Sequence, residues 1–363
     1  MKNQQVIISG GGTAGHIYPA LVVGQKLKNK GLQITFVGST RKLEQSIMKH
    51  SHADFIPLKI EGLKGKGWRT IKSLFILPYS FVKSFLIILN KKPSLVIGMG
   101  GYSSGPIVLL SSLLGIPCLI MEQNVCPGLT NRLLTPFVQK AVVAFQKSLP
   151  EFKGKGVHLG NPVRAEFESL QPKPREERLT VLFFGGSQGS HFLNTCIVKS
   201  LPLLKKDQGS LYFYHQTGES DLNWVQKQYQ KAGFENAEVS AYFFEIYKYF
   251  EKSDLIVCRA GATTIAEVIA AQKPSILVPF PHSTDNHQLL NANELERIKG
   301  AQVLVEKDFT PQSFSSKIRD FMKNQHKLEL MAQKLRQLKI KNSADKIADL
   351  CVELMNNPKE AAH

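Results

Sequence analysis

The chain has 363 residues, of which 43% are hydrophobic and 21% are charged. This composition excludes a wholly disordered chain, and the length suits two domains of roughly 150 to 180 residues rather than one. The net charge of +17 favours acidic partners, namely nucleic acid, anionic lipid or phosphorylated substrates, but no zinc-finger spacing, RNP-type aromatic motif or long basic run supports nucleic acid.

The cysteines and the apolar segments bear on where the protein works. Five cysteines, with no CxxC spacing, predict core thiols in a reducing compartment rather than a disulfide framework or a zinc site. The first apolar run is too short for a signal peptide. Pro78 and Lys83 interrupt the longest apolar stretch, residues 73–89, which falls short of a bilayer span. We therefore expect a soluble or peripherally attached cytoplasmic protein.

Short apolar runs alternate with helical spacing in the first half of the chain. A glycine turn follows the first run and glycines close several of the others, an order typical of a parallel sheet covered by helices. The predicted strands are residues 6–9, 34–38, 94–98, 117–121 and 141–145, with a helix over residues 19–30. The first lobe is therefore predicted to be doubly wound α/β up to about Gly160.

The same architecture repeats after a polar, proline-bearing linker. The linker is predicted at residues 171–178, and strands follow at residues 179–184, 211–215, 255–258 and 275–278. We place one domain at residues 1–163 and the other at 164–342, with an amphipathic helix at about 343–356 packing back on the first. Two such lobes are expected to form a cleft faced by the carboxyl ends of both sheets.

The first glycine loop, residues 10–15, has the GxGxxG pattern of dinucleotide enzymes. That class also needs an acid at the end of the second strand, where this chain has residues 37–40, VGST, so a nicotinamide or flavin enzyme is disfavoured. The N–H groups of the following helix start can still bind phosphate. His16 is then either a capping or packing histidine or a general base, which the helix N-terminus would keep neutral.

Two loops of the second lobe repeat this device. In residues 185–189, GGSQG, Ser187 either caps a helix or donates to a phosphate. Residues 259–267 open a further helix, in which Glu267 is either a glutamate that helps the helix dipole or an acceptor for ribose hydroxyls. The polar loop at residues 279–288 suits sugar hydroxyls, or is plain surface.

The remaining candidate loops lie in the first lobe. Residues 100–106 and 122–124 follow strands, and Arg164 at the lobe junction is placed to hold a phosphate or a carboxylate. No cluster has metal-ligand spacing and no DxD pair follows these strands. We therefore expect no cofactor and no metal. If the substrate is a sugar diphosphate, its leaving diphosphate would be stabilised by helix N-termini and backbone amides.

Seven separated motifs together resemble those of the MurG-type transferases. They are GGGTAGH, GMGGYSSGP, EQN, GNPVR, GGSQGS, CRAGATTIAE and the DNHQ loop, and they span nearly the whole chain. The resemblance implies a GT-B fold of two Rossmann-like doubly wound domains, with the acceptor on the first and UDP-GlcNAc mainly on the second. It implies inverting transfer of N-acetylglucosamine to the C4 hydroxyl of undecaprenyl-pyrophosphoryl-MurNAc-pentapeptide, which converts lipid I to lipid II in peptidoglycan synthesis.

The resemblance also implies roles for individual residues. His16 and Glu122 are the implied catalytic residues, with Gly100, Gly101 and Tyr102 on the acceptor side. The implied contacts with UDP-GlcNAc are Thr13, Ala14, Gly15, Asn124, Arg164, Ser187, Phe243, Ala262, Thr263, Thr264, Ile265, Ala266, Glu267 and Gln288. The chain departs from the family pattern at Ala14, Met121 and Ser190, where glycine, histidine and alanine are usual, and the Ala14 methyl group narrows the approach to the loop.

The implied location is peripheral, on the cytoplasmic face of the bacterial plasma (inner) membrane. Anionic membrane lipids and other cell-wall synthesis and division proteins are the implied partners, and nucleic acid is not. A candidate attachment segment joins basic residues to apolar ones, as interfacial segments do: Lys64, Lys66, Trp68, Arg69 and Lys72, then Leu74, Phe75, Ile76, Leu77, Phe81, Phe85 and Leu86. The alternative is a helix whose apolar face is simply core.

Other functions stay open on the sequence. A related GT-B glycolipid transferase or a non-hydrolysing UDP-GlcNAc epimerase would share the fold. A non-catalytic nucleotide-sugar-binding subunit is a further alternative, although the presence of both lobes in one chain argues against it.

Overall fold

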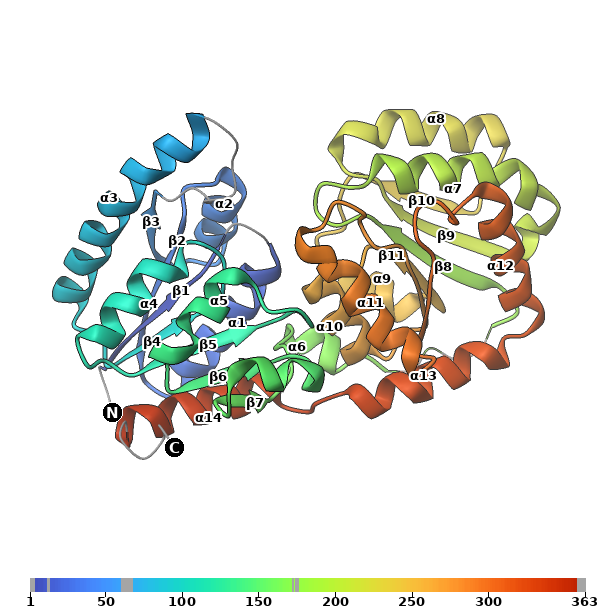
Figure 1. The fold of residues 1–363 in the computed structure, drawn as a ribbon. Coiled ribbons are helices and arrows are strands. Elements are labelled where there is room, and N and C mark those ends of the chain that lie inside the picture. The colour runs from blue at the N-terminus through green and yellow to red at the C-terminus, as the bar shows by residue number, and fades with distance from the viewer. Residues whose placement is uncertain (1–3, 12–13, 60–67, 172, 174–175, 358–363) are drawn as a thin grey trace. The chain divides into compact units, whose positions relative to one another are not determined.

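The computed structural model of the chain describes residues 4–11, 14–59, 68–171, 173 and 176–357, with the backbone alone for residues 14, 43 and 68–77. The chain divides into two compact units, shown in Figure 1. The first unit comprises Met1–Arg164 and Ile340–His363, and the second comprises Ala165–Lys339. Arg164, which we expected to begin the second domain, therefore belongs to the first unit, and the chain returns to the first unit at Ile340.

A parallel sheet forms the centre of the first unit. Its strand order is β3-β2-β1-β4-β5-β6-β7. The strands are β1 (Gln5–Ser9), β2 (Gln33–Ser39), β3 (Asp54–Leu58), β4 (Leu95–Gly98), β5 (Cys118–Glu122), β6 (Lys140–Val143) and β7 (Gly156–His158). The order reverses between β1 and β4, where Ser9 is level with Gly98, so the loops after these two strands meet at a topological switch point.

Helices cover both faces of this sheet, because successive strand residues point to opposite faces and both sets are apolar. Ile8 and Ile97 share one core with α1 and α14, while Ile7 and Val96 share the other with α4 and α5. Asp345 of α14 also accepts a bond from Lys26 Nζ of α1 at 2.8 Å. The helices are α1 (Ala14–Asn29), α2 (Lys42–His50), α3 (Trp68–Lys91), α4 (Ser104–Leu113), α5 (Leu129–Leu134) and α14 (Ser343–Asn356).

The second unit has the same design. Its sheet runs in the order β10-β9-β8-β11-β12-β13, and the order reverses between β8 and β11. The strands are β8 (Leu179–Phe184), β9 (Leu211–Gln216), β10 (Ala237–Ser240), β11 (Leu255–Cys258), β12 (Ser275–Leu277) and β13 (Ala301–Val303). Cys258 is level with Phe184, which brings the loops after β8 and β11 together.

Aromatic residues fill both faces of the second sheet. On one face the Phe183 ring meets Phe213 and Phe314 at centroid distances of 5.0 and 5.8 Å, and on the other Phe184 meets Phe250 at 5.7 Å. The helices are α6 (Ala165–Glu168), α7 (His191–Leu204), α8 (Leu222–Ala232), α9 (Ile246–Lys252), α10 (Ala262–Ala271), α11 (His287–Arg297), α12 (Pro311–Lys323) and α13 (His326–Leu338). The prediction of two doubly wound parallel-sheet domains is confirmed.

Candidate active site

His16 lies in the first turn of α1 and is oriented by the glycine loop before it. Its Nδ1 is 3.2 Å from the carbonyl oxygen of Gly11. Because a carbonyl oxygen only accepts, Nδ1 must donate, and the lone pair of the neutral ring is then on Nε2. This is the tautomer that a general base acting through Nε2 requires.

The loop after β4 packs closely against this histidine. Gly100 and Gly101 have φ values of +90° and +75°, which side-chain-bearing residues rarely adopt. A Cβ atom at Gly100 would lie 3.4 Å from His16 Nε2, and one at Gly101 would lie 2.7 Å from the Gly11 oxygen. The sequence GGY therefore allows the β4 loop to reach the imidazole, which brings predicted acceptor-side residues and the predicted base together.

Glu122 ends β5 with its side chain 3% exposed. One carboxylate oxygen accepts from the Asn124 N–H at 3.0 Å and from Asn124 Nδ2 at 3.2 Å. The other accepts from the Gly128 N–H at 3.0 Å and from Asn131 Nδ2 at 2.9 Å. These bonds match the usual acceptor capacity of an ionised carboxylate, so Glu122 fixes the loop that carries Asn124.

Arg164 reaches α1 within the first unit. Its guanidinium carbon is 5.3 Å from the centre of the Tyr18 ring, two residues beyond His16. Cation–π contact at this distance attracts the guanidinium to the face of the ring. Of the other predicted contacts in this unit, Thr13 and the side chain of Ala14 lie outside the part of the chain that the structure describes.

In the second unit, the glycine loop after β8 packs backbone to backbone on the loop after β9. A Cβ atom at Gly189 would lie 1.9 Å from the Thr217 oxygen, so only glycine fits. The side chain that caps α7 is Ser190, whose Oγ accepts from the Leu193 N–H at 3.5 Å. Ser187 is exposed and is not the cap, so its hydroxyl remains a candidate phosphate contact.

Arg259 ties together the loops at this edge of the second sheet, a role that the motif alone did not reveal. Its side chain is 10% exposed and makes an ion pair of 2.6 Å with Glu306, which follows β13. It also donates to Ser190 Oγ at 2.9 Å and to the carbonyls of Val278 and Pro279 at 3.2 and 3.3 Å. The serine that departs from the family pattern is thus both a helix cap and an acceptor for Arg259.

The start of α10 offers backbone rather than side-chain contacts. Gly261 is the N-cap, so the N–H groups of residues 262–264 have no partner within the helix. Ile265 and Ala266 are 1% and 9% exposed, so their side chains are buried away from the predicted donor site. Glu267 lies in the second turn, 7% exposed, and is not the first-turn acid of this helix.

The last two predicted donor contacts, Phe243 and Gln288, make hydrogen bonds within the second unit. The Phe243 ring is 3% exposed and stacks on Tyr249 at 3.8 Å, and its N–H donates to Gln216 Oε1 at 2.9 Å. Its carbonyl is therefore the backbone group to consider for a ligand. Gln288 in α11 accepts from the Phe280 N–H at 3.0 Å through its side-chain oxygen, which leaves the amide nitrogen for donation.

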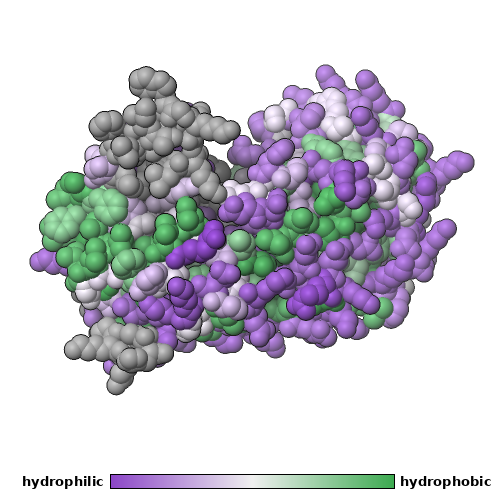
Figure 2. Space-filling model, viewed as in Figure 1, coloured by the Kyte–Doolittle hydropathy of each residue, from purple (hydrophilic) through white to green (hydrophobic). Residues whose placement is uncertain are grey.

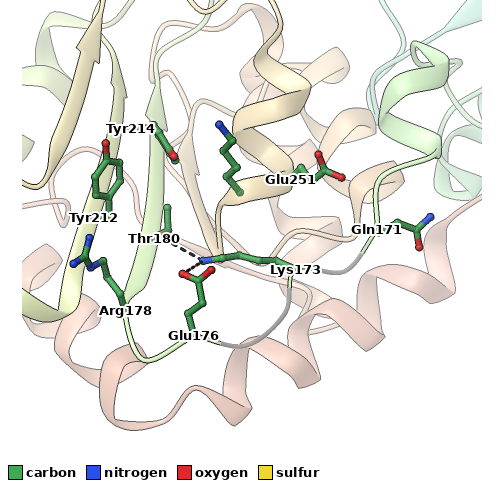
Figure 3. Close-up of a pocket in the computed structure, with 9 residues that line it drawn as sticks. Gln171, Lys173, Glu176, Arg178, Thr180, Tyr212, Tyr214 and Glu251 are labelled. Carbon is green, nitrogen blue, oxygen red and sulfur yellow. Dashed lines mark hydrogen bonds and ion pairs between the residues drawn. The ribbon is translucent and has the colours of Figure 1, made fainter.

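A pocket of about 500 Å³ in the second unit lies apart from these residues. Figure 3 shows Lys173 at its centre, bonded to Thr180 Oγ1 at 3.2 Å and paired with Glu176 at 3.4 Å, with Tyr212 and Tyr214 on β9. None of the predicted site residues lines it. Among the described residues, no group of three or more His, Cys, Asp or Glu side chains is arranged to hold a metal ion.

Comparisons with known proteins identify the family. Residues 6–143 match the glycosyltransferase family 28 N-terminal domain, and residues 180–349 match the family 28 C-terminal domain. The chain belongs to glycosyltransferase family 28. The Myxococcus xanthus relative, named UDP-N-acetylglucosamine--N-acetylmuramyl-(pentapeptide) pyrophosphoryl-undecaprenol N-acetylglucosamine transferase, is 38% identical over 97% of this chain and 93% of its own. A Syntrophus aciditrophicus transferase of the same name is 37% identical over 97% and 99%.

Solved structures agree with this family 28 assignment. The crystal structure of Acinetobacter baumannii MurG superposes with a TM-score of 0.79 at 29% identity, over 96% of this chain and 99% of that one. The resemblance to the MurG-type transferases is confirmed. A putative UDP-N-acetylglucosamine 2-epimerase from Listeria monocytogenes, at 11% identity and a TM-score of 0.69, shares the fold alone.

Proposed function

We propose that this family 28 protein transfers N-acetylglucosamine from UDP-GlcNAc to the C4 hydroxyl of undecaprenyl-pyrophosphoryl-MurNAc-pentapeptide, with inversion. The observation that carries the proposal is the identity of 37–38% over 97% of the chain to transferases named for this reaction. The two glycine loops also support the proposal, because such a transfer needs N–H donors for a diphosphate and a base beside the acceptor hydroxyl.

His16 is the proposed base. Its Nε2 takes the proton of the acceptor hydroxyl while that oxygen attacks the anomeric carbon of N-acetylglucosamine. The bond from the anomeric carbon to the diphosphate breaks, UDP leaves with the electron pair, and attack opposite the leaving group inverts the configuration. Glu122 then acts by holding Asn124 and Asn131 in place, since its oxygens are occupied by their N–H groups.

The second unit is the proposed donor site. The exposed Ser187 and the N–H groups at the start of α10 would bind the diphosphate, and the Phe243 carbonyl and Gln288 amide would bind the rest of the donor. Glu267 would accept from the ribose hydroxyls. Helix N-termini, backbone amides and Arg164 would stabilise the leaving UDP without a metal ion.

We also propose that α3 attaches the protein peripherally to a membrane. Its described part exposes an apolar face at helical spacing: Tyr79, Val82, Phe85, Leu86 and Leu89, each 40–61% exposed. Figure 2 shows hydrophobic residues gathered over α3 and α4. Lys64 and Lys66 lie outside the described residues, and so do the side chains of residues 68–77. No helix among the described residues has the length and apolar character to cross a bilayer.

The transfer is tested with labelled UDP-GlcNAc and purified lipid I, with and without EDTA. We expect label in the extracted lipid in both cases. Label in diacylglycerol but not in lipid I, or epimerisation of UDP-GlcNAc without acceptor, would overturn the assignment, as would activity that appears only with a second protein. Loss of activity in EDTA, restored by a divalent ion, would refute the metal-free account of the leaving group.

Membrane attachment is tested by sedimentation with vesicles rich in anionic lipid. Val82→Glu combined with Leu86→Glu should abolish co-sedimentation, because charge on this face opposes insertion. The matched control is Leu330→Glu, an exposed leucine (45%) of the second unit, which should bind like the unaltered protein. Equal binding of all three proteins would refute a role for α3.

A further inference from the structure

A buried carboxylate lies behind the first glycine loop. Glu44, in the first turn of α2, is 1% exposed. Its Oε2 accepts from the Ser39 hydroxyl, at the end of β2, at 2.5 Å. The dinucleotide pattern requires an acid at the end of this strand, and here the acid follows five residues after Ser39. The Glu44 carboxylate lies against Gly11 and Gly38.

The carboxylate of Glu44 occupies the space that side chains at two glycines would need. A Cβ atom at Gly11 would lie 2.1 Å from Glu44 Oε1, and one at Gly38 would lie 1.9 Å from the same oxygen. Neither glycine has a positive φ. A side chain at either position would therefore require the Glu44 carboxylate to move.

Gly11 connects this carboxylate to the proposed base. The carbonyl oxygen of Gly11 accepts the Nδ1 proton of His16 at 3.2 Å, and the same oxygen abuts Gly101. Any shift of Gly11 toward the space of Glu44 would move that oxygen and release the imidazole. We propose that Glu44 is a positioning residue, whose carboxylate holds Gly11 so that its carbonyl fixes the Nδ1–H tautomer and the orientation of His16.

The surroundings of Glu44 suit a buried carboxyl group. Burying a carboxylate is costly unless donors and positive potential surround it. Ser39 supplies a hydroxyl donor, and the N-terminus of α2 supplies positive potential at its third residue. The fold therefore places a hydroxyl donor and a helix N-terminus beside a buried carboxyl group, at a place where an apolar side chain would serve for packing alone.

The first test asks whether Glu44 and the glycines share one space. Gly38→Ala in the unaltered protein should lower both the melting temperature and kcat, because the new methyl group displaces the carboxylate. In a Glu44→Ala background, Gly38→Ala should be neutral or should raise the melting temperature, because the methyl group fills the vacated space. Equal effects of Gly38→Ala in both backgrounds would overturn the shared space on which the proposal stands.

The second test follows His16 itself. In nitrogen NMR spectra of histidine-labelled protein, the His16 ring should show the Nδ1–H tautomer, and Glu44→Ala should mix the two tautomers. The kcat of Glu44→Ala should fall by about 10- to 100-fold, as expected for a misplaced catalytic group, while the KM for UDP-GlcNAc stays within about two-fold. Ser46→Ala, an exposed residue of the same helix, is the matched control.

A second variant keeps the proposal testable if Glu44→Ala fails to fold. Glu44→Gln retains the volume and an acceptor for Ser39, so it should fold, keep the Nδ1–H tautomer and lose less activity than Glu44→Ala. An unchanged tautomer together with unchanged kcat in every folded Glu44 variant would overturn the role.

The catalytic part of this inference rests on the proposed function, and the two can fail separately. If the unaltered protein transfers no sugar to lipid I, the proposed function fails. The tautomer and the coupling between Glu44 and Gly38 are measured without substrate, so they still decide whether Glu44 orients His16.

Discussion

Replacing Glu122 by glutamine separates a positioning role from a role in proton transfer. The carboxylate accepts four N–H donors, two from Asn124 and one each from Gly128 and Asn131, at 2.9–3.2 Å. A glutamine amide has the same shape but only one oxygen, and its nitrogen only donates. One pair of donors therefore loses its acceptor and faces another donor.

The magnitude follows from those contacts. Hydrogen bonds to charged groups contribute about 1.5–3 kcal/mol each, so losing two of them in a buried site should cost about 3 kcal/mol or more of the free energy of unfolding. For a unit of this size, each kcal/mol lowers the melting temperature by roughly 2–4 °C. We therefore expect Glu122→Gln to melt about 6–12 °C lower, with a parallel loss of kcat as the Asn124 loop loosens.

Differential scanning calorimetry and the lipid I assay measure the two effects on the same preparation. Glu151→Gln, an exposed glutamate of the same unit, controls for the change of charge and should alter neither quantity. An unchanged melting temperature with kcat reduced more than about 1,000-fold would refute the positioning argument, because a loss of that size without destabilisation is what removal of a general base produces.

His16→Ala should lower kcat by about 100- to 10,000-fold while calorimetric UDP affinity stays unchanged; undiminished turnover would remove it from the mechanism. Glu267→Ala should weaken UDP-GlcNAc binding by about 10-fold or more through lost ribose contacts, and equal affinity would contradict that role. Burial lowers the pKa of His215 to about 3, so protonation of its unfolded form should reduce stability as pH falls below about 6.5, by up to about 1.4 kcal/mol per pH unit. Urea unfolding at pH 7.5 and 5.0 should show this slope, and His215→Gln should flatten it; equal slopes would refute the assignment.

The central strands were predictable because burial on both faces leaves a continuous apolar signal. All residues of β4 and β11 are buried, and each run ends at or just before a glycine or polar loop. The edge strands carry no such signal. β3 includes Pro57 and buries only Leu58, and β10 is only half-buried, so their assignment depends on pairing with β2 and β9.

The candidate site was predictable where position along the chain determines position in space. Residues that follow parallel strands must lie at the same sheet edge, and this places His16 beside Gly100 without further information. The direction and the burial of side chains could not be predicted in this way, because they depend on how the helices pack against the sheet. Nothing local marks Glu44 as buried or Arg259 as the tie between four loops, and Ser187 and Ser190 are equally plausible caps until the path of α7 is known.

The two glycine loops differ in the charge that the fold buries near them, and this difference bears on which of them receives the diphosphate. Glu44 touches the first loop at Gly11, whereas Arg259 bonds to Ser190 at the end of the second. At an effective dielectric constant of 20, a unit negative charge about 6 Å from a phosphate charge would repel it by about 3 kcal/mol. Glu306 pairs with Arg259 at 2.6 Å and cancels most of its charge, so the difference between the loops comes mainly from the Glu44 carboxylate beside the first. Since helix N-termini alone would attract phosphate to both loops, the carboxylate beside the first loop disfavours a diphosphate there, in agreement with the proposal that the diphosphate binds at the second loop and that His16 acts on a neutral hydroxyl at the first.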